Sequence, residues 1–100
     1  MKSVRFHPEA EVELAAEALY YEERSPGLGE RFTDEIEAAL ELASEFPLIG
    51  SPYRHDTRRV FPRTFPFAIV YQVLASELLV LAIAPFPRKP AYWRGRRSDG

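Results

Sequence analysis

The sequence predicts a two-layer α+β domain in which a hairpin of two helices packs on one face of a mainly antiparallel, four-stranded sheet. Two segments with a helical repeat of apolar residues, 8–24 and 26–46, are joined by a short connection. One alternating stretch precedes them and three β-type runs follow, so the order is strand, helix, helix, three strands. A chain of 100 residues has room for one domain. We expect this domain to span residues 1–95, with residues 96–100 as a flexible tail.

The first strand is predicted at Ser3–Phe6, where polar and apolar residues alternate. Pro8 then begins a helix, because its missing N–H would be unpaired in the first turn of any helix. Glutamates early in this helix suit the positive end of the helix dipole. We expect the helix to end near Arg24. Its stripe of apolar residues at the spacing i, i+3, i+4, i+7 consists of Val12, Ala15, Ala16 and Leu19.

The second helix is predicted to begin at Ser25, a good N-cap, with Pro26 as its first helical residue. Pro47 ends it, and the following Gly50-Ser51-Pro52 is typical of a turn. Its apolar stripe, which we expect to face the sheet, consists of Phe32, Ile36, Ala39, Leu40 and Ala43.

The second half of the chain changes to β-type patterns. A short strand is predicted at 57–61, and residues 67–73 are rich in aromatic and β-branched side chains. Residues 78–84 are apolar throughout, which indicates a central strand covered on both faces. Residues 91–94 are predicted to form one helical turn.

The composition excludes several classes of site. The chain has no cysteine and two histidines, so it has no disulfide, no thiolate metal site and no histidine-rich cluster. No serine lies in the G-x-S-x-G motif of hydrolases. No apolar run reaches the roughly 18 residues that a membrane span needs. We therefore expect a cytoplasmic protein without metal, cofactor or membrane partner.

The charges are divided between the two halves of the chain. Residues 1–50 carry four basic and twelve acidic side chains, whereas residues 51–100 carry nine basic and three acidic ones. The acids lie between the apolar stripes of the helices and are read as a solvated surface. The basic residues form two clusters with aromatic residues between them, a composition that suits either an RNA surface or an interface for an acidic peptide. The clusters are Arg54, Arg58, Arg59 and Arg63, and Arg88, Lys89, Arg94, Arg96 and Arg97.

An ordered set of short motifs resembles the RelE/ParE toxin superfamily of bacterial type II toxin–antitoxin modules, and within it the ParE branch, whose members are often called plasmid stabilisation proteins. The resemblance extends from about Phe6 to Arg94. The motifs are Tyr20-Tyr21, Ser25-Pro26-x-Leu28-Gly29-x-Arg31-Phe32, Phe46-Pro47-x-x-Gly50-x-Pro52, Arg58-Arg59-Val60, Phe65-Pro66-Phe67-x-Ile69-x-Tyr71 and Arg88-x-Pro90-x-Tyr92-Trp93.

The resemblance implies a cognate antitoxin that wraps and neutralises the chain in a hetero-oligomer. ParE-like relatives poison DNA gyrase without a known catalytic site, whereas RelE-like relatives are ribosome-dependent mRNA endonucleases. As a nuclease, this chain would rely on Arg59, Arg88 and Tyr92. It departs from the nuclease pattern at Ala68, where active relatives carry arginine, and at Pro85, where many carry histidine.

The resemblance therefore favours a non-enzymatic gyrase poison, with the mRNA nuclease as the first alternative and a non-toxic module that only binds an antitoxin as the second. The implied antitoxin contacts are Arg58, Arg59 and Tyr71, which would meet an amphipathic acidic segment. The implied target contacts are Arg88, Lys89, Tyr92, Trp93 and Arg94.

Overall fold

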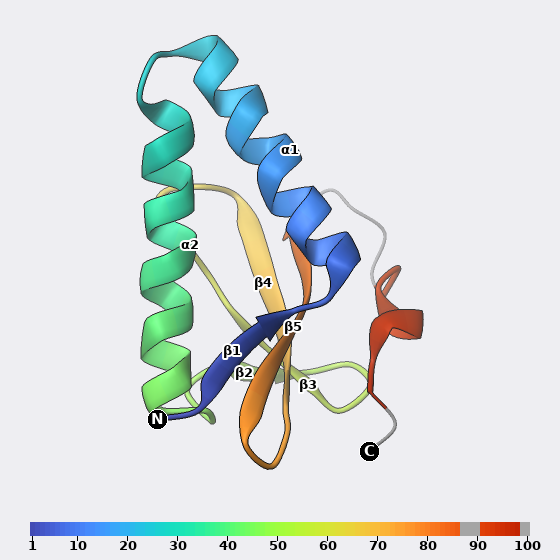
Figure 1. Ribbon diagram of the computed structural model, residues 1–100. Coiled ribbons are helices and arrows are strands. Elements are labelled where there is room, and N and C mark those ends of the chain that lie inside the picture. Colours follow the sequence, from blue (N-terminus) through green and yellow to red (C-terminus); the bar gives the residue numbers. More distant parts are fainter. Residues whose placement is uncertain (87–90, 99–100) are drawn as a thin grey trace.

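The chain folds into two layers, in which the helices α1 (Pro8–Arg24) and α2 (Leu28–Glu45) lie against one sheet (Figure 1). The computed structural model describes residues 1–86 and 91–98. The α+β class and the order strand, helix, helix, strands are confirmed. The strands are β1 (Ser3–Phe6), β2 (Ser51–Tyr53), β3 (Thr57–Val60), β4 (Phe67–Val73) and β5 (Glu77–Pro85), and a 3-10 helix, η1 (Arg94–Arg96), follows them.

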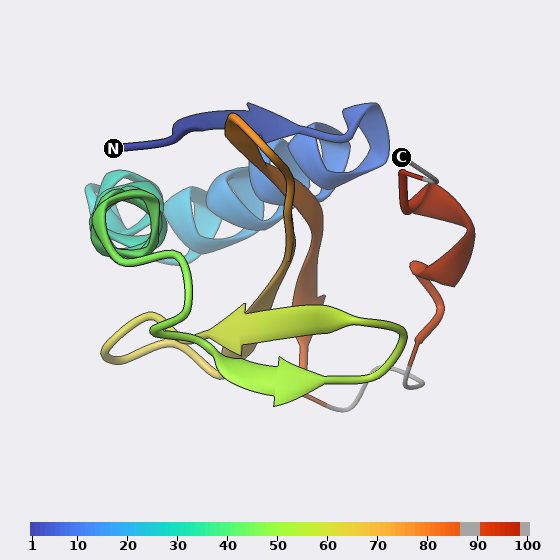
Figure 2. The ribbon, with the colours of Figure 1, turned by 90° about the horizontal axis from the view of Figure 1, so that it is seen from below.

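The sheet has five strands in the order β1-β5-β4-β3-β2, one more than predicted. β1 runs parallel to β5, and the other neighbours are antiparallel. The additional strand, β2, includes Ser51 and Pro52, which the sequence suggested as a turn; Ser51 pairs with Arg59 of β3. Three residues are too few to display alternation, and a proline within a strand is tolerated at a sheet edge. Figure 2 shows β2 and β3 crossing β4 and β5 steeply, so the sheet is strongly twisted.

The connection between the helices differs from the prediction. The N–H of Ser25 bonds to the carbonyl of Tyr21, so Ser25 closes α1 instead of capping α2. α2 begins after Gly27, whose φ of 87° lies in the left-handed region that favours glycine. The carboxylate of Glu22 accepts the N–H groups of Gly27 and Gly29, at 2.9 and 3.1 Å. A glutamate of the preceding helix therefore supplies the acceptor that we expected from Ser25.

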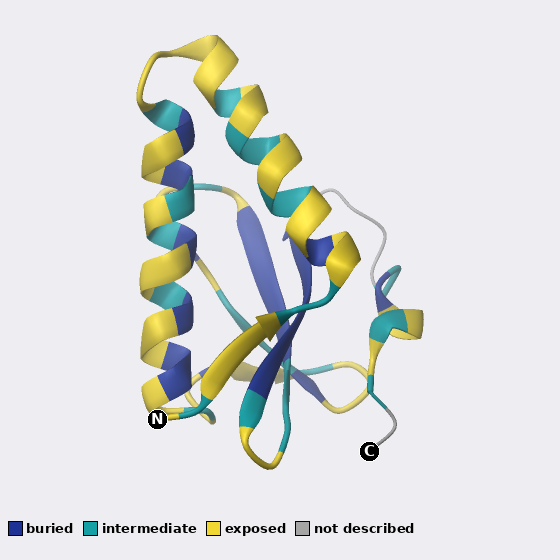
Figure 3. Cartoon of the chain, in the orientation of Figure 1, coloured by how far each residue is buried: buried dark blue, intermediate teal, exposed yellow. Residues whose placement is uncertain are grey.

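The face of α1 that packs on the sheet is not the predicted stripe. Ala10 is buried, and Leu14, Ala18 and Tyr21 continue the packed face. Val12 and Leu19 of the predicted stripe are 62% and 61% exposed, and Figure 3 shows exposed residues recurring along α1. Both stripes have helical spacing, and the packed one includes the bulky Tyr21 ring, which joins an aromatic cluster with Phe32, Phe65 and Phe67. The stripe of α2 is packed inward as predicted.

Two apolar layers cover the sheet, one on each face. The helices cover one face, where Phe32 and Ile36 of α2 pack against β4 and β5. The C-terminal segment covers the other face, where Trp93 packs against Val70 and Leu81, and Figure 2 shows it on the side of β4 and β5 opposite α2. The prediction that residues 78–84 form a strand buried on both faces is therefore confirmed.

Candidate functional site

The C-terminal segment is attached to the sheet through Trp93. This side chain is 1% exposed, and its ring lies 5.9 Å from that of Tyr53 on β2. Burial of a tryptophan is a large apolar contribution to stability. Trp93, which the sequence placed among target contacts, is thus an anchor for the residues around it in the free chain.

A carboxylate on α1 holds the same segment in a second way. β1 ends opposite Val80, so the outer edge of β5 is open beyond that point. There, Glu13 accepts a hydrogen bond from the N–H of Ile83 at 3.0 Å. Glu13 also accepts one from the Tyr92 hydroxyl at 2.9 Å and pairs with Arg96 at 3.1 Å. Arg96, which we expected in a flexible tail, also donates to a carbonyl of β5 at 2.9 Å.

The two predicted basic clusters meet beside this segment. Arg97 donates to the carbonyl of His55, in the turn between β2 and β3, at 3.2 Å. Arg54 of that turn and Arg94 of η1 are both exposed. Desolvation lowers the pKa of His55, and so do the positive charges of Arg97 and Arg94. The exposed guanidinium groups give this surface its positive charge, which attracts anionic partners. Arg88 and Lys89, the other predicted target contacts, lie outside the described residues.

Arg59 lies on β3 between two aromatic rings. Its guanidinium is 3.9 Å from the centre of the Tyr53 ring and 5.4 Å from that of Phe61. Its Nε atom is buried and has no hydrogen-bond acceptor among the described residues. Buried donors in folded proteins are nearly always paired, so an unpaired one indicates a missing acceptor.

Arg58 and Tyr71, the other expected antitoxin contacts, hold the connection between α2 and β2. Arg58 donates to the carbonyls of Leu48 and Gly50, at 3.1 and 2.7 Å. Tyr71 is fully buried, donates to the carbonyl of Pro47 at 2.8 Å and accepts from the N–H of Gly50 at 3.0 Å. Burial raises the pKa of Tyr71, so the hydroxyl is protonated and able to donate at neutral pH. Both side chains therefore hold the backbone of residues 47–50 in place.

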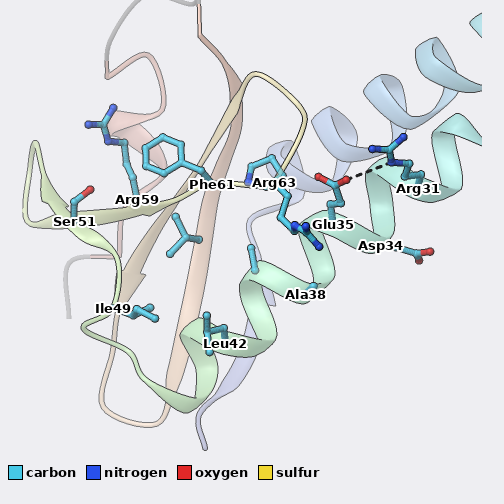
Figure 4. A pocket seen from close by; sticks show the side chains of 13 residues that line it. Arg31, Asp34, Glu35, Ala38, Leu42, Ile49, Ser51, Arg59, Phe61 and Arg63 are labelled. Atoms are coloured by element: carbon cyan, nitrogen blue, oxygen red, sulfur yellow. Dashed lines mark ion pairs between the residues drawn. The ribbon is translucent and has the colours of Figure 1, made fainter.

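Next to this connection lies a groove of about 630 Å³ between α2 and β3, shown in Figure 4. Its apolar lining includes Leu42 of α2, Ile49 of the connection and Val60 of β3. Figure 4 shows Arg63 reaching from the sheet side toward α2. The sequence analysis missed this groove, although two signals were present: Leu42 lies outside the predicted stripe of α2, and Leu48-Ile49 is apolar in a loop.

A salt bridge closes one end of the groove. Arg31 lies 3.5 Å from Glu35. Glu35 also accepts the N–H and the hydroxyl of Thr64, at 2.8 and 2.7 Å, which ties α2 to the connection between β3 and β4. Although desolvation acts in the opposite direction, the hydrogen bonds from Thr64 and the charge of Arg31 lower the pKa of Glu35. This end of the groove is therefore fixed in place.

Neither a metal-ligand cluster nor a membrane-spanning helix is found among the described residues. Among residues 1–86 and 91–98, no group of three or more His, Cys, Asp or Glu side chains could hold a metal ion. No helix in that part of the chain is long and apolar enough to cross a membrane. The Tyr92 hydroxyl, one of the three nuclease candidates, donates to a carboxylate of α1. Arg59, a second candidate, has a charge but is a poor proton shuttle, because arginine stays protonated.

Known proteins resemble this chain in both sequence and fold. Residues 4–85 match the family model described as ParE toxin of type II toxin-antitoxin system, parDE. The fold is similar to that of a solved chain from the chromosomal ParDE TA system of P. aeruginosa, with a TM-score of 0.62. The two chains are 19% identical over 85% of this chain and 96% of that one, so this likeness concerns the fold alone. No curated protein matches the sequence.

Proposed function

The chain belongs to the ParE toxin family of type II toxin–antitoxin systems, and from this we propose that it is the toxin of such a pair, neutralised by a cognate antitoxin in a hetero-oligomer. The observation that carries the proposal is the extent of the family match, which runs from β1 to the end of β5 and includes both helices. In this proposal, the antitoxin and the cellular target both bind the basic and apolar surface that the sheet and the C-terminal segment form.

The proposed target is DNA gyrase, bound without catalysis in the cytoplasm. The exposed basic residues around η1, Arg54 and Arg94, are the described groups best placed to contact it. Trp93 and Glu13 support them indirectly, because they fix the segment that carries Arg94. Arg88, Lys89 and the aromatic Tyr92 complete the proposed target surface.

The test is a gyrase assay with the purified chain, free of antitoxin. We expect loss of supercoiling and accumulation of cleavage complexes. Arg54→Glu and Arg94→Glu are expected to weaken both effects, because they reverse charge at the proposed contact. Arg24→Glu, on the exposed end of α1, is the matched control and keeps the wild-type effect. Unchanged supercoiling and unchanged cleavage complexes with the wild type would overturn gyrase as the target.

One observation favours a second candidate function, ribosome-dependent cleavage of mRNA. The unpaired Nε of Arg59, between Tyr53 and Phe61, suits a phosphate next to a stacked base. A translating extract supplied with the wild type or Arg59→Ala separates the two functions. Cleavage of mRNA by the wild type but not by Arg59→Ala would support the nuclease function. Intact mRNA with the wild type would overturn that function.

A further inference from the structure

We propose that the basic surface around His55 contacts the phosphodiester backbone of the duplex DNA that gyrase holds, so that the chain binds DNA as well as protein when it poisons the enzyme. This surface consists of His55 and the guanidinium groups of Arg54, Arg94 and Arg97. The proposal rests on the proposed function and deepens it, because it names the DNA of the gyrase complex as a direct partner of this surface.

The surface around His55 carries positive charge that no carboxylate neutralises directly. Arg54, Arg94 and Arg97 are exposed, and none of them forms an ion pair within residues 1–86 and 91–98. After the larger effect of desolvation, the charges of all three lower the pKa of His55, so all three lie within electrostatic range of its ring. Asp56, in the same turn, offsets one of these charges, so an excess of positive charge remains. Such a surface attracts anions.

The turn between β2 and β3 and the C-terminal segment hold these groups in a fixed arrangement. Arg97 donates to the carbonyls of His55 and Arg94, at 3.2 Å in both cases. The His55 ring lies 6.1 Å from the buried ring of Trp93. His55 and Asp56 have φ angles of 59° and 60°, as in the tight turns that join antiparallel strands. A preformed set of donors loses little conformational freedom when it binds an anion.

The composition of this surface suits phosphates better than a protein partner. No large apolar side chain is exposed in the segments 51–56 and 91–98, whose aromatic side chains are buried or half-buried. The centre of a protein–protein interface is apolar and depleted in charge, whereas protein–DNA interfaces are more polar and strongly positive. Because Trp93 is buried, it offers no free ring on which an unpaired base could stack, which favours duplex over single-stranded DNA.

The acidic residues lie mainly on the other side of the molecule. The twelve acidic side chains of residues 1–50 all belong to α1 and α2, and Figure 2 shows the C-terminal segment on the side of β4 and β5 opposite α2. Glu13, which reaches that segment, is paired with Arg96. The net charge of −2 is therefore compatible with a local contact to DNA. We expect contacts to a few phosphates within the gyrase complex, and only weak DNA binding by the chain alone.

A crosslinking experiment with gyrase and labelled linear duplex DNA identifies what the surface contacts. The chain has no cysteine, so Gly95→Cys in η1 and Ala16→Cys on α1 each introduce one thiol that can carry a photoactivatable aryl azide. Nothing lies within 4 Å of the Cβ position of Gly95, and Ala16 is an exposed residue of a helix. We expect crosslinks to DNA in the cleavage complex from Gly95→Cys and none from Ala16→Cys.

The salt dependence of poisoning gives a second readout that needs no label. The measured quantity is the concentration of chain that gives half of the maximal cleavage complexes, at several concentrations of KCl. We expect Arg54→Ala and Arg94→Ala each to reduce the slope of log potency against log salt concentration by about 1, because each removes a phosphate contact. Arg24→Ala, at the exposed end of α1, is expected to keep the wild-type slope. Circular dichroism verifies that each variant is folded.

The outcomes separate this proposal from the proposed function. Crosslinks from Gly95→Cys to gyrase subunits without crosslinks to DNA, or equal crosslinks to DNA from both positions, overturn DNA as the partner and leave gyrase as the target. Unchanged slopes in Arg54→Ala and Arg94→Ala do the same, and the salt series decides if the label on Gly95→Cys blocks poisoning. If the wild type does not poison gyrase, both proposals fail.

Discussion

Glu13 on the first helix lies 3.1 Å from Arg96 in the 3-10 helix near the C-terminus, and this ion pair joins the two ends of the chain. The same carboxylate accepts hydrogen bonds from the N–H of Ile83 and the hydroxyl of Tyr92. One side chain thus covers the open part of the edge of β5 and fastens the segment that carries the proposed target surface.

Replacing Glu13 by glutamine is expected to lower the free energy of unfolding by about 1–3 kcal/mol, because the amide cannot satisfy the same three donors. Urea denaturation gives this quantity. Glu23→Gln, on an exposed part of α1, should change stability by less than about 0.5 kcal/mol. Equal stability of the two variants would show that the carboxylate does not fasten the segment.

Tyr71→Phe is expected to destabilise the chain by about 1–3 kcal/mol, because removal of the buried hydroxyl leaves the N–H of Gly50 without its acceptor. Thermal unfolding of the variant measures the loss. Tyr20→Phe removes a hydroxyl from a side chain that is 45% exposed, and is expected to leave the melting temperature unchanged. A neutral Tyr71→Phe would contradict the role given to this side chain.

Gly50→Ala is expected to destabilise the chain by about 1–3 kcal/mol, because its Cβ would lie 2.6 Å from the Tyr71 hydroxyl and 2.8 Å from the carbonyl oxygen of Arg59. Gly95→Ala is the matched control, since nothing lies within 4 Å of its Cβ position. Chemical denaturation of both variants tests the difference, and a stable Gly50→Ala would mean that β2 has room to shift.

Acid is expected to weaken the attachment of β1 to β5. Hydrogen bonds from Arg5, at 2.7 and 3.0 Å, lower the pKa of Glu77 below its ordinary value of 4.5. Since the folded pKa is below the unfolded one, the stabilisation is fully present above pH 4.5 and is lost as the pH falls through the folded pKa. Urea midpoints measured from about pH 7 to about pH 3 should therefore fall less in Glu77→Gln than in the wild type.

Glu37→Gln, an exposed residue of α2, is the control for that series. Its midpoint should follow the wild type over the whole range. An identical acid response in Glu77→Gln and the wild type would remove Arg5 and Glu77 as a source of acid sensitivity.

Periodicity predicted the layers and the order of the elements, because long helices and long strands repeat their pattern several times. It could not predict β2, whose three residues are too few for a repeat. It also could not choose between the two apolar stripes of α1, since Val12 and Leu14 both lie at helical spacing from apolar neighbours. Only the packing of Tyr21 against the Phe residues of α2 and the sheet makes that choice.

The candidate site was predictable in its composition but not in its arrangement. The basic residues of the second half were identified, and Arg97 does reach the turn at His55. Trp93 precedes Arg94 and Tyr71 lies in an aromatic, β-branched run, and either position suits an interface and a core equally well. In the free chain both side chains are buried. The groove combines α2, the connection after it and β3, so no local pattern contains it.

The parallel pairing of β1 with β5 also has a consequence for biosynthesis. Ser3–Phe6 leave the ribosome before both helices, whereas their hydrogen-bonding partners at 77–80 are synthesised only after β4. The donors that bind the Glu13 carboxylate, the N–H of Ile83 and the guanidinium of Arg96, are likewise synthesised long after Glu13 itself. A nascent chain that stalls before β5 therefore has no partner for β1, and the basic surface around η1 forms only after Arg94–Arg96 have been synthesised. An inhibitor that recognises this surface must act after synthesis, whereas the helical hairpin is complete much earlier.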